Sequence, residues 1–127
     1  MKFLSKYSDV AYLLLRIVFA FLFMSHGYQR VFTGPVLGPP DFPPLGVANI
    51  IEVIAGPLLL IGLFTRPVAF IASGEMAVAY FLAHVPRGSI IPMLNMGEIT
   101  VALCFGFLYI ATCGGGRYSV DAMMGRT

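Results

Sequence analysis

Long apolar runs separated by short polar breaks fill most of this sequence. Four runs are almost wholly apolar, and they cover residues 10–26, 47–64, 67–84 and 93–113. Each run has about the length that a helix needs to cross a hydrocarbon core roughly 30 Å thick. Because backbone polar groups must be paired inside lipid, each run is predicted to be helical. The pattern predicts an all-α membrane protein, a four-transmembrane-helix bundle that forms a single transmembrane domain over residues 1–127.

Glycine and proline mark the ends of the predicted spans. Residues 25–27, Ser-His-Gly, are expected to end the first span, and the three glycines at 114–116 to end the fourth. Pro67 suits the first turn of the third span. The proline-rich segment 34–46 predicts a stiff connector at the outer surface, with a lid as the alternative. Residues 118–124 predict a short amphipathic segment on the inner surface.

Composition and charge support a membrane protein and predict its orientation. The chain is 58% hydrophobic and 11% charged, whereas a soluble domain carries about 25% charged residues. No basic stripe or nucleic-acid motif is present, which argues against a nucleic-acid partner. Basic residues favour one side of the membrane by five to two, so both termini are predicted to be cytoplasmic. The five are Lys2, Lys6, Arg66, Arg117 and Arg126, and the two are Arg30 and Arg87.

The two halves of the chain repeat a short polar pattern. The second and fourth spans open with Asn-x-x-Glu, and the first and third carry one charge followed by a histidine nine or ten residues later. These pairs are Asn49 with Glu52, Asn95 with Glu98, Arg16 with His26, and Glu75 with His84. The repetition predicts two pseudo-repeated helical hairpins. A capping box at each helix start is the alternative explanation for Asn-x-x-Glu.

Each span carries one ionisable residue that lipid would disfavour, namely Arg16, Glu52, Glu75 or Glu98. A charge in hydrocarbon costs roughly 2.5–3.5 kcal/mol, so these side chains are expected to meet inside the bundle. Counting about 1.5 Å per residue predicts an outer polar layer and a deeper Arg16–Glu75 pair. The outer layer is expected to hold His26, His84, Glu52, Glu98, Asn49 and Asn95.

The predicted interior holds one arginine and three glutamates. The surplus carboxylates must be protonated, paired with a protonated histidine or bound to a cation, as in proton-handling and ion-binding sites. The candidate catalytic residues are Glu52, Glu98 and His26, and the candidate ligand-binding residues are Arg16, Glu75, His84, Asn49 and Asn95. A metal ion would be held by His26, His84, Glu52 and Glu98. Structural roles, such as an Arg16–Glu75 clasp and interfacial histidines, are the alternatives.

Four segments together resemble the DoxX family. They are LLLRIVFAFLFMSHGYQRVF (13–32), NIIEVIAGPLLLIGLFTRPVA (49–69), NMGEI (95–99) and GGGRYSVDAMM (114–124). The resemblance implies a small bacterial inner-membrane protein of four transmembrane helices. The family takes its name from relatives of a quinone-linked sulfur-oxidising enzyme, and some members are tied to membrane oxidoreductase complexes. The resemblance therefore also implies a link to such complexes.

These observations favour a membrane subunit of a quinone-linked oxidoreductase system that binds a quinone or a similar amphipathic ligand in its polar core. A metal- or haem-binding membrane protein and a non-catalytic scaffold or assembly subunit are the alternatives. No flavin, NAD or P-loop motif appears, so nothing in the sequence indicates that this subunit catalyses a reaction by itself. Whether it is an enzyme stays open. The expected partners are the lipid bilayer, redox subunits and further copies of the chain.

Overall fold

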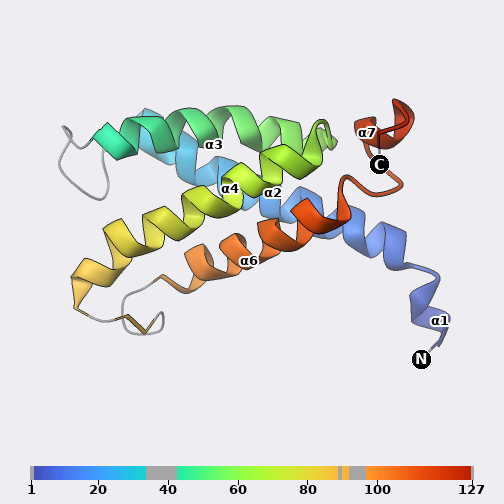
Figure 1. Ribbon diagram of the computed structural model, residues 1–127, viewed down its shortest axis with the longest axis horizontal. Coiled ribbons are helices and arrows are strands. Elements are labelled where there is room, and N and C mark those ends of the chain that lie inside the picture. The colour runs from blue at the N-terminus through green and yellow to red at the C-terminus, as the bar shows by residue number, and fades with distance from the viewer. Residues whose placement is uncertain (1, 34–42, 89, 92–96, 127) are drawn as a thin grey trace.

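The computed structural model describes a bundle of helices. The described residues are 2–33, 43–88, 90–91 and 97–126, and side chains are described except those of 26–33, 43–49, 83, 84 and 87. Within these residues the chain is all-helical, without a strand, as the sequence predicted (Figure 1). The α-helices are α1 (Lys2–Ser5), α2 (Ser8–Thr33), α3 (Pro43–Ile61), α4 (Thr65–Ala79), α6 (Glu98–Cys113) and α7 (Val120–Met123). A π-helical turn, η1 (Tyr80–His84), and a 3-10 turn, η2 (Val85–Arg87), extend α4.

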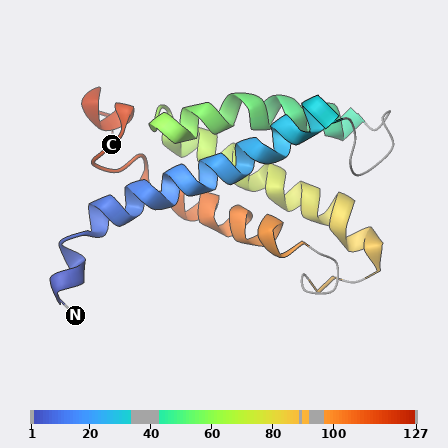
Figure 2. The ribbon, with the colours of Figure 1, turned by 180° about the vertical axis from the view of Figure 1, so that it is seen from behind.

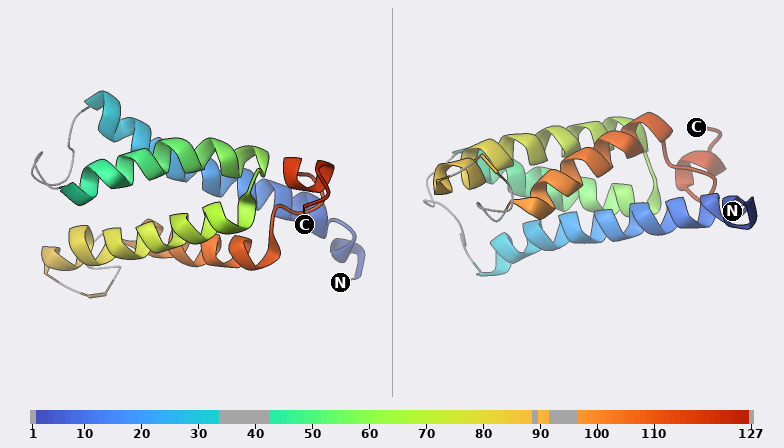
Figure 3. Two further views of the ribbon diagram at one scale, coloured as in Figure 1. Left: turned by 45° about the horizontal axis from the view of Figure 1, so that its top comes forward. Right: turned by 90° about the horizontal axis from the view of Figure 1, so that it is seen from below.

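The four long helices pack as two pairs. Helix α2 packs along α3, and α4 packs along α6, while α3 and α4 are joined by a tight turn and also pack together. Figure 2 shows the same arrangement from behind, and both views place the two chain ends at one end of the bundle. We call this the terminal end. The views in Figure 3 place α7 and α1 there as well, beyond the α3–α4 turn.

Local sequence signals at three of the helix ends proved correct. Pro67 lies in the first turn of α4, which begins at Thr65. Helix α6 ends at Cys113, followed by Gly114 with φ +81°. Helix α7 falls inside the segment 118–124 that was predicted to be amphipathic. At Pro67 and Gly114 the residue's own backbone preference sets the boundary, and the Ser119 hydroxyl caps the start of α7.

Two predicted boundaries were wrong. Helix α2 runs on to Thr33, so residues 25–27 do not end it. One glycine costs only about 1 kcal/mol inside a helix, and the flanking helical residues outweigh it. Helix α3 begins at Pro43, so the last four residues of the predicted connector 34–46 are helical. Proline is favoured in a first turn because its missing N–H is not needed there.

The capping-box explanation for Asn-x-x-Glu is also wrong. Asn49 lies within the second turn of α3, because the helix has already begun at Pro43. In the other half, Gly97 occupies the N-cap position of α6 and Glu98 is its first helical residue. Asn95 lies outside the described residues. Glu52 therefore belongs to the interior of its helix, and its polar character serves something other than a helix start.

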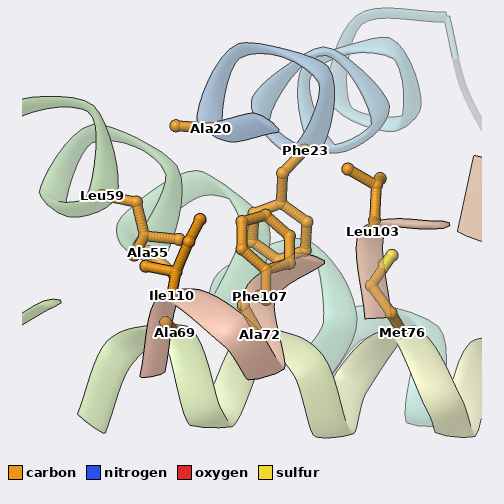
Figure 4. Packing of buried hydrophobic residues seen from close by; sticks show 10 residues of the cluster. All are labelled: Ala20, Phe23, Ala55, Leu59, Ala69, Ala72, Met76, Leu103, Phe107 and Ile110. Atoms are coloured by element: carbon orange, nitrogen blue, oxygen red, sulfur yellow. The ribbon is translucent and has the colours of Figure 1, made fainter. Parts of the chain in front are cut away.

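The core is packed by apolar side chains from all four long helices (Figure 4). Phe23 of α2 and Phe107 of α6 meet edge to face, with ring centroids 5.0 Å apart. Two glycines allow α2 to approach its neighbours. A Cβ at Gly106 would lie 1.8 Å from the Phe19 ring, and one at Gly56 would lie 1.9 Å from the Met24 side chain. These glycines are close-packing positions, which small residues commonly provide between membrane helices.

The outside of the bundle carries many large apolar side chains. Large side chains are widely exposed along the helices, including Phe21, Phe70, Phe81 and Phe105, each more than half exposed. Within the described residues, one helix is long and apolar enough to span a membrane, over Ser8–Ser25 near the N-terminus. The apolar helices Ile50–Ile61 and Glu98–Cys113 are shorter. Four spans therefore stay a prediction.

Candidate functional site

Arg16 is buried at the terminal end and binds main-chain carbonyls. Its side chain is 2% exposed, and its Nε donates to the carbonyl of Leu59 at 3.0 Å. One terminal nitrogen donates to the carbonyl of Gly115, and the other to those of Leu60 and Tyr118 at 3.3 and 3.0 Å. Helix side chains point back toward the N-terminus of their helix, and in α2 this direction leads to the terminal end. The guanidinium thereby joins the end of α3 to the segment after α6.

Asp121 connects α7 to the start of α4, and its side chain accepts hydrogen bonds where that of Arg16 donates them. Its two carboxylate oxygens accept the backbone N–H groups of Phe64 and Thr65 at 2.9 and 2.8 Å. The backbone N–H of Asp121 donates to the carbonyl of Gly62. A negative charge at a helix N-terminus is favourable, because the first amides are unsatisfied and the helix dipole is positive there. Phe64 has φ +51°, so this carboxylate holds a strained residue in place.

The charge state of Asp121 follows from these contacts. Burial, the largest single influence, raises the pKa of this carboxyl. The hydrogen bonds from Thr65 and Phe64 and the nearby Arg126 charge lower it, and together they outweigh burial, so the pKa lies below its ordinary value. Asp121 is therefore ionised at neutral pH and caps α4 as an anion.

Glycines make room for this assembly. Gly62 has φ +75°, and a Cβ there would lie 2.5 Å from the Ser119 Cβ and 3.0 Å from the Arg16 guanidinium. A Cβ at Gly115 would lie 2.6 Å from the Ser119 hydroxyl. Ser119 in turn caps α7 by accepting the N–H of Ala122 at 3.1 Å. We call Arg16, Gly62, Gly115, Ser119 and Asp121 the terminal clasp.

Two further side chains bind the end of α6. The Tyr12 hydroxyl donates to the carbonyl of Gly114, and the Arg66 guanidinium donates to that of Thr112, each at 2.5 Å. The last carbonyls of a helix lack partners within it, so these donors satisfy groups that would otherwise be costly next to lipid. The polar groups at this end hold helices together, which is a structural task.

The predicted Arg16–Glu75 pair is wrong. The Arg16 guanidinium lies beside Gly62 and the carbonyls at the end of α3, close to where α4 begins. Glu75 is ten residues into α4 from Thr65, which corresponds to about 15 Å along the helix. Arg16 therefore binds carbonyl oxygens at the end of the bundle, and Glu75 lies deeper within it.

Glu52 and Glu75 lie at one level of the bundle. Each is ten residues from the α3–α4 turn, so both sit about 15 Å from the terminal end. The Glu52 side chain has no exposed area, and it continues the buried stripe of Ala55 and Leu59 on α3. Both carboxylate oxygens of Glu75 are also shielded from solvent. Neither carboxylate is isolated, because each takes part in polar contacts.

Hydroxyl groups from two helices accompany the carboxylates. Ser73, Tyr80 and Thr100 are each at most 7% exposed. The Ser73 hydroxyl donates to the carbonyl of Cys104 at 2.7 Å, which ties α4 to α6, and the Tyr80 hydroxyl donates to the carbonyl of Ile90. We call these hydroxyls together with Glu52 and Glu75 the mid-bundle layer. Its two carboxylates and three hydroxyls are all shielded from solvent.

The remaining candidates are placed by their positions along the helices. Glu98 begins α6 with an exposed side chain, about 9 Å along the helix before Cys104. His26 lies in α2 and His84 in η1, and their side chains fall outside the description, as does that of Asn49. Among the described residues, no three His, Cys, Asp or Glu side chains cluster as metal ligands. A metal site using His26 and His84 stays a prediction.

Sequence reasoning missed Asp121 and the carbonyl partners of Arg16. The signal was available in the closing segment GGGRYSVD, whose structural interpretation was limited to a helix stop and an amphipathic turn. Its glycines, serine and aspartate are the residue types that make tight turns and caps. Their concentration in eight residues indicated a specific folded connection.

Comparison with known proteins agrees with the resemblance. The DoxX family model matches residues 11–85, more than half of the chain. A Haemophilus influenzae protein described as uncharacterized is 39% identical over 93% of this chain and 93% of its own. The Escherichia coli inner membrane protein YqjF is 28% identical over 97% of this chain and 98% of its own.

A Mycobacterium tuberculosis protein described as an uncharacterized membrane protein is 23% identical over 88% of this chain and 80% of its own. No solved structure matches the chain. The chain belongs to the DoxX family, and it is a membrane protein.

Proposed function

We propose that this DoxX protein is a four-span inner-membrane subunit of a quinone-linked redox system and that its mid-bundle layer binds the quinone. The observation that carries the proposal is the complete burial of Glu52 at the level of Glu75. The one arginine among the described buried residues, Arg16, is about 15 Å away and bound to carbonyls. Intramembrane carboxylates are costly, and their usual roles are proton relays and ligand or ion sites.

The chemistry of a quinone suits this layer. A quinone has an apolar ring and tail, and its two carbonyl oxygens take up protons when electrons arrive from a redox partner. Protonated Glu52 or Glu75 donates a hydrogen bond to such an oxygen, and the same carboxyl groups give or take the proton. The widely exposed phenylalanines on the outside of the bundle match the acyl chains among which quinones diffuse.

The four-span topology follows from the same proposal. Helices α2, α3 and α6 are apolar over most of their length, and α4 with η1 and η2 extends the third span to Arg87. Both termini lie at one end, which is consistent with four crossings, and the excess of basic residues supports a cytoplasmic location for that end. A periplasm-active reporter fused after residue 38 should be active, and one fused after residue 126 should be inactive. The reverse pattern would refute this orientation.

Quinone binding is tested on the purified protein in nanodiscs with a short-chain ubiquinone. The parent should bind, and Glu52→Gln and Glu75→Gln should each weaken binding at least tenfold, about 1.4 kcal/mol. Gln keeps the shape of Glu but cannot exchange a proton. Asp9→Asn, which removes an exposed carboxylate at the terminal end, is the matched control and should bind like the parent.

Glu98→Gln separates the proposed layer from the outer layer predicted by sequence. If Glu98→Gln alone weakens binding, the ligand sits near the start of α6 and the mid-bundle layer is not the site. If Glu52→Gln and Glu75→Gln both keep the affinity of the parent, quinone binding by this layer is refuted.

A structural membrane subunit is the second candidate, and the terminal clasp favours it. The residues of the closing GGGRYSVD segment serve helix packing and capping. For a purely structural subunit, Glu52→Gln would lower the stability of the bundle, and quinone would not bind to the parent.

A further inference from the structure

We propose that the terminal end carries a binding surface for anionic phospholipid headgroups. The surface is formed by five basic side chains, three of which stack on exposed aromatic rings. It comprises Lys2, Lys6, Tyr7, Phe64, Arg66, Arg117, Tyr118 and Arg126, and we call it the basic collar. It lies apart from the mid-bundle layer, so it is a second site with a different ligand.

Cation and ring are paired at three separate places in the collar. The Lys6 ammonium lies 5.0 Å from the centroid of the Tyr7 ring. The Arg117 guanidinium lies 5.8 Å from Tyr118. A third pair, Arg126 over Phe64, has a separation of 4.6 Å. A ring under a cation limits its motion and leaves its other donors open to a phosphate.

The collar has a large excess of positive charge. Its five cations are all exposed, and one exposed acid, Asp9, accompanies them in the described part of this end, 3.8 Å from Arg117. The other acid, Asp121, is buried and bound to the amides of α4. The surface therefore complements an anion. Its cations lie in and just after α1, in the first turn of α4, and in the segments on either side of α7.

Exposed apolar side chains indicate that the anion belongs to a membrane. Met123 is 86% exposed, Phe3 63% and Tyr7 53%, and they accompany the cations at the same end. Such side chains enter the boundary between headgroups and acyl chains, whereas a site for a soluble phosphate has no use for them. The spread of cations around the end suits a layer of headgroups, and each cation near an anionic surface strengthens binding about fivefold.

The test compares the protein in nanodiscs of phosphatidylcholine with nanodiscs that contain 30% phosphatidylglycerol. The parent should unfold at a higher temperature in the anionic nanodiscs, and 0.5 M NaCl should remove most of the difference, because salt screens exposed charges. The variant Arg117→Gln/Arg126→Gln should lose at least half of the difference. The matched control is Arg30→Gln/Arg87→Gln, which removes two arginines from the opposite end and should retain it.

Three results would overturn the proposal: no difference for the parent, an equal loss in both double variants, or the same stabilisation by inorganic phosphate in phosphatidylcholine nanodiscs. If the Arg117/Arg126 variant does not fold, Lys2→Gln/Lys6→Gln carries the same test, because these residues precede α2 and lie outside the terminal clasp. The parent's enrichment of phosphatidylglycerol over phosphatidylethanolamine among co-purified lipids provides an independent measurement, and no enrichment would also overturn the proposal.

Discussion

The terminal clasp and the mid-bundle layer both place ionisable side chains inside an apolar bundle, but they treat the charges differently. In the clasp, Arg16 and Asp121 each bind backbone groups at helix ends, where unsatisfied carbonyls and amides are already present. In the layer, Glu52 and Glu75 lie within helices whose backbone groups are paired internally. The comparison teaches that a buried charge at a helix end completes the fold by binding unsatisfied backbone groups, whereas a buried charge in mid-helix has no such groups of its own helix beside it.

Arg16→Met should have the largest effect on stability. The substitution removes the guanidinium that joins α3 to the segment after α6, and buried carbonyls lose their hydrogen-bond donor. We expect the free energy of unfolding to fall by about 3 kcal/mol or more. Equilibrium unfolding in mixed micelles measures the loss. Arg30→Met, on the same helix and outside the clasp, is the control. Equal stability of the two variants would contradict the structural role of Arg16.

Gly62→Ala tests how tightly the clasp is packed. The new Cβ would collide with Ser119, and φ +75° is unfavourable for alanine, so we expect a loss of about 1–3 kcal/mol. Gly74→Ala is the matched variant, because nothing lies within 4 Å of its Cβ position. In a helix that change should be neutral or slightly stabilising. A loss at Gly74 as large as that at Gly62 would argue against a specific role for the clasp.

Asp121→Asn should cost about 0.5–2 kcal/mol at pH 7, the usual range for a lost helix cap. Because the pKa of Asp121 is lower in the folded protein than in the unfolded chain, its contribution is complete above pH of about 4. It is lost as the pH falls further toward the folded-state pKa. Unfolding of parent and variant should therefore converge in acid, and a constant difference down to pH 2 would exclude Asp121 as the cause.

Glu52→Gln should have the smallest effect on stability, within about 1 kcal/mol, although it removes quinone binding in the proposed function. The substitution keeps side-chain volume and hydrogen-bonding capacity in the buried stripe of α3. Thermal unfolding in nanodiscs without quinone measures the change in stability. A loss of stability as large as that of Arg16→Met would show that Glu52 has a structural role, and the contrast between the two regions would then not hold.

The fold was predictable where local chemistry decides it. The glycine after Cys113 and the proline in the first turn of α4 determine backbone geometry by themselves, so these helix ends were correct. The end of α2 was wrong because Gly27 alone is a weak helix breaker, and the start of α3 because proline also begins helices.

The site was predictable in composition and not in its contacts. The place of Glu52 in an apolar run implied burial, and the structure confirms it. The partners of Arg16 were missed because reasoning from charges pairs a cation with an anion, whereas backbone carbonyls serve equally well. The carbonyl of Gly115 lies 99 positions away in sequence, so the contact depends on the complete bundle. The side chains of His26 and His84 lie outside the described residues, and their roles stay predictions.

The long sequence separation between Arg16 and its acceptors has a consequence for biosynthesis. Arg16 leaves the ribosome about one hundred residues before Gly115 and Tyr118. Until those residues are translated, the cation on the first helix has only its earlier acceptors, the carbonyls of Leu59 and Leu60. Nascent chains arrested before residue 114 should consequently remain targets for membrane proteases, because the late segment completes the shielding of that early charge.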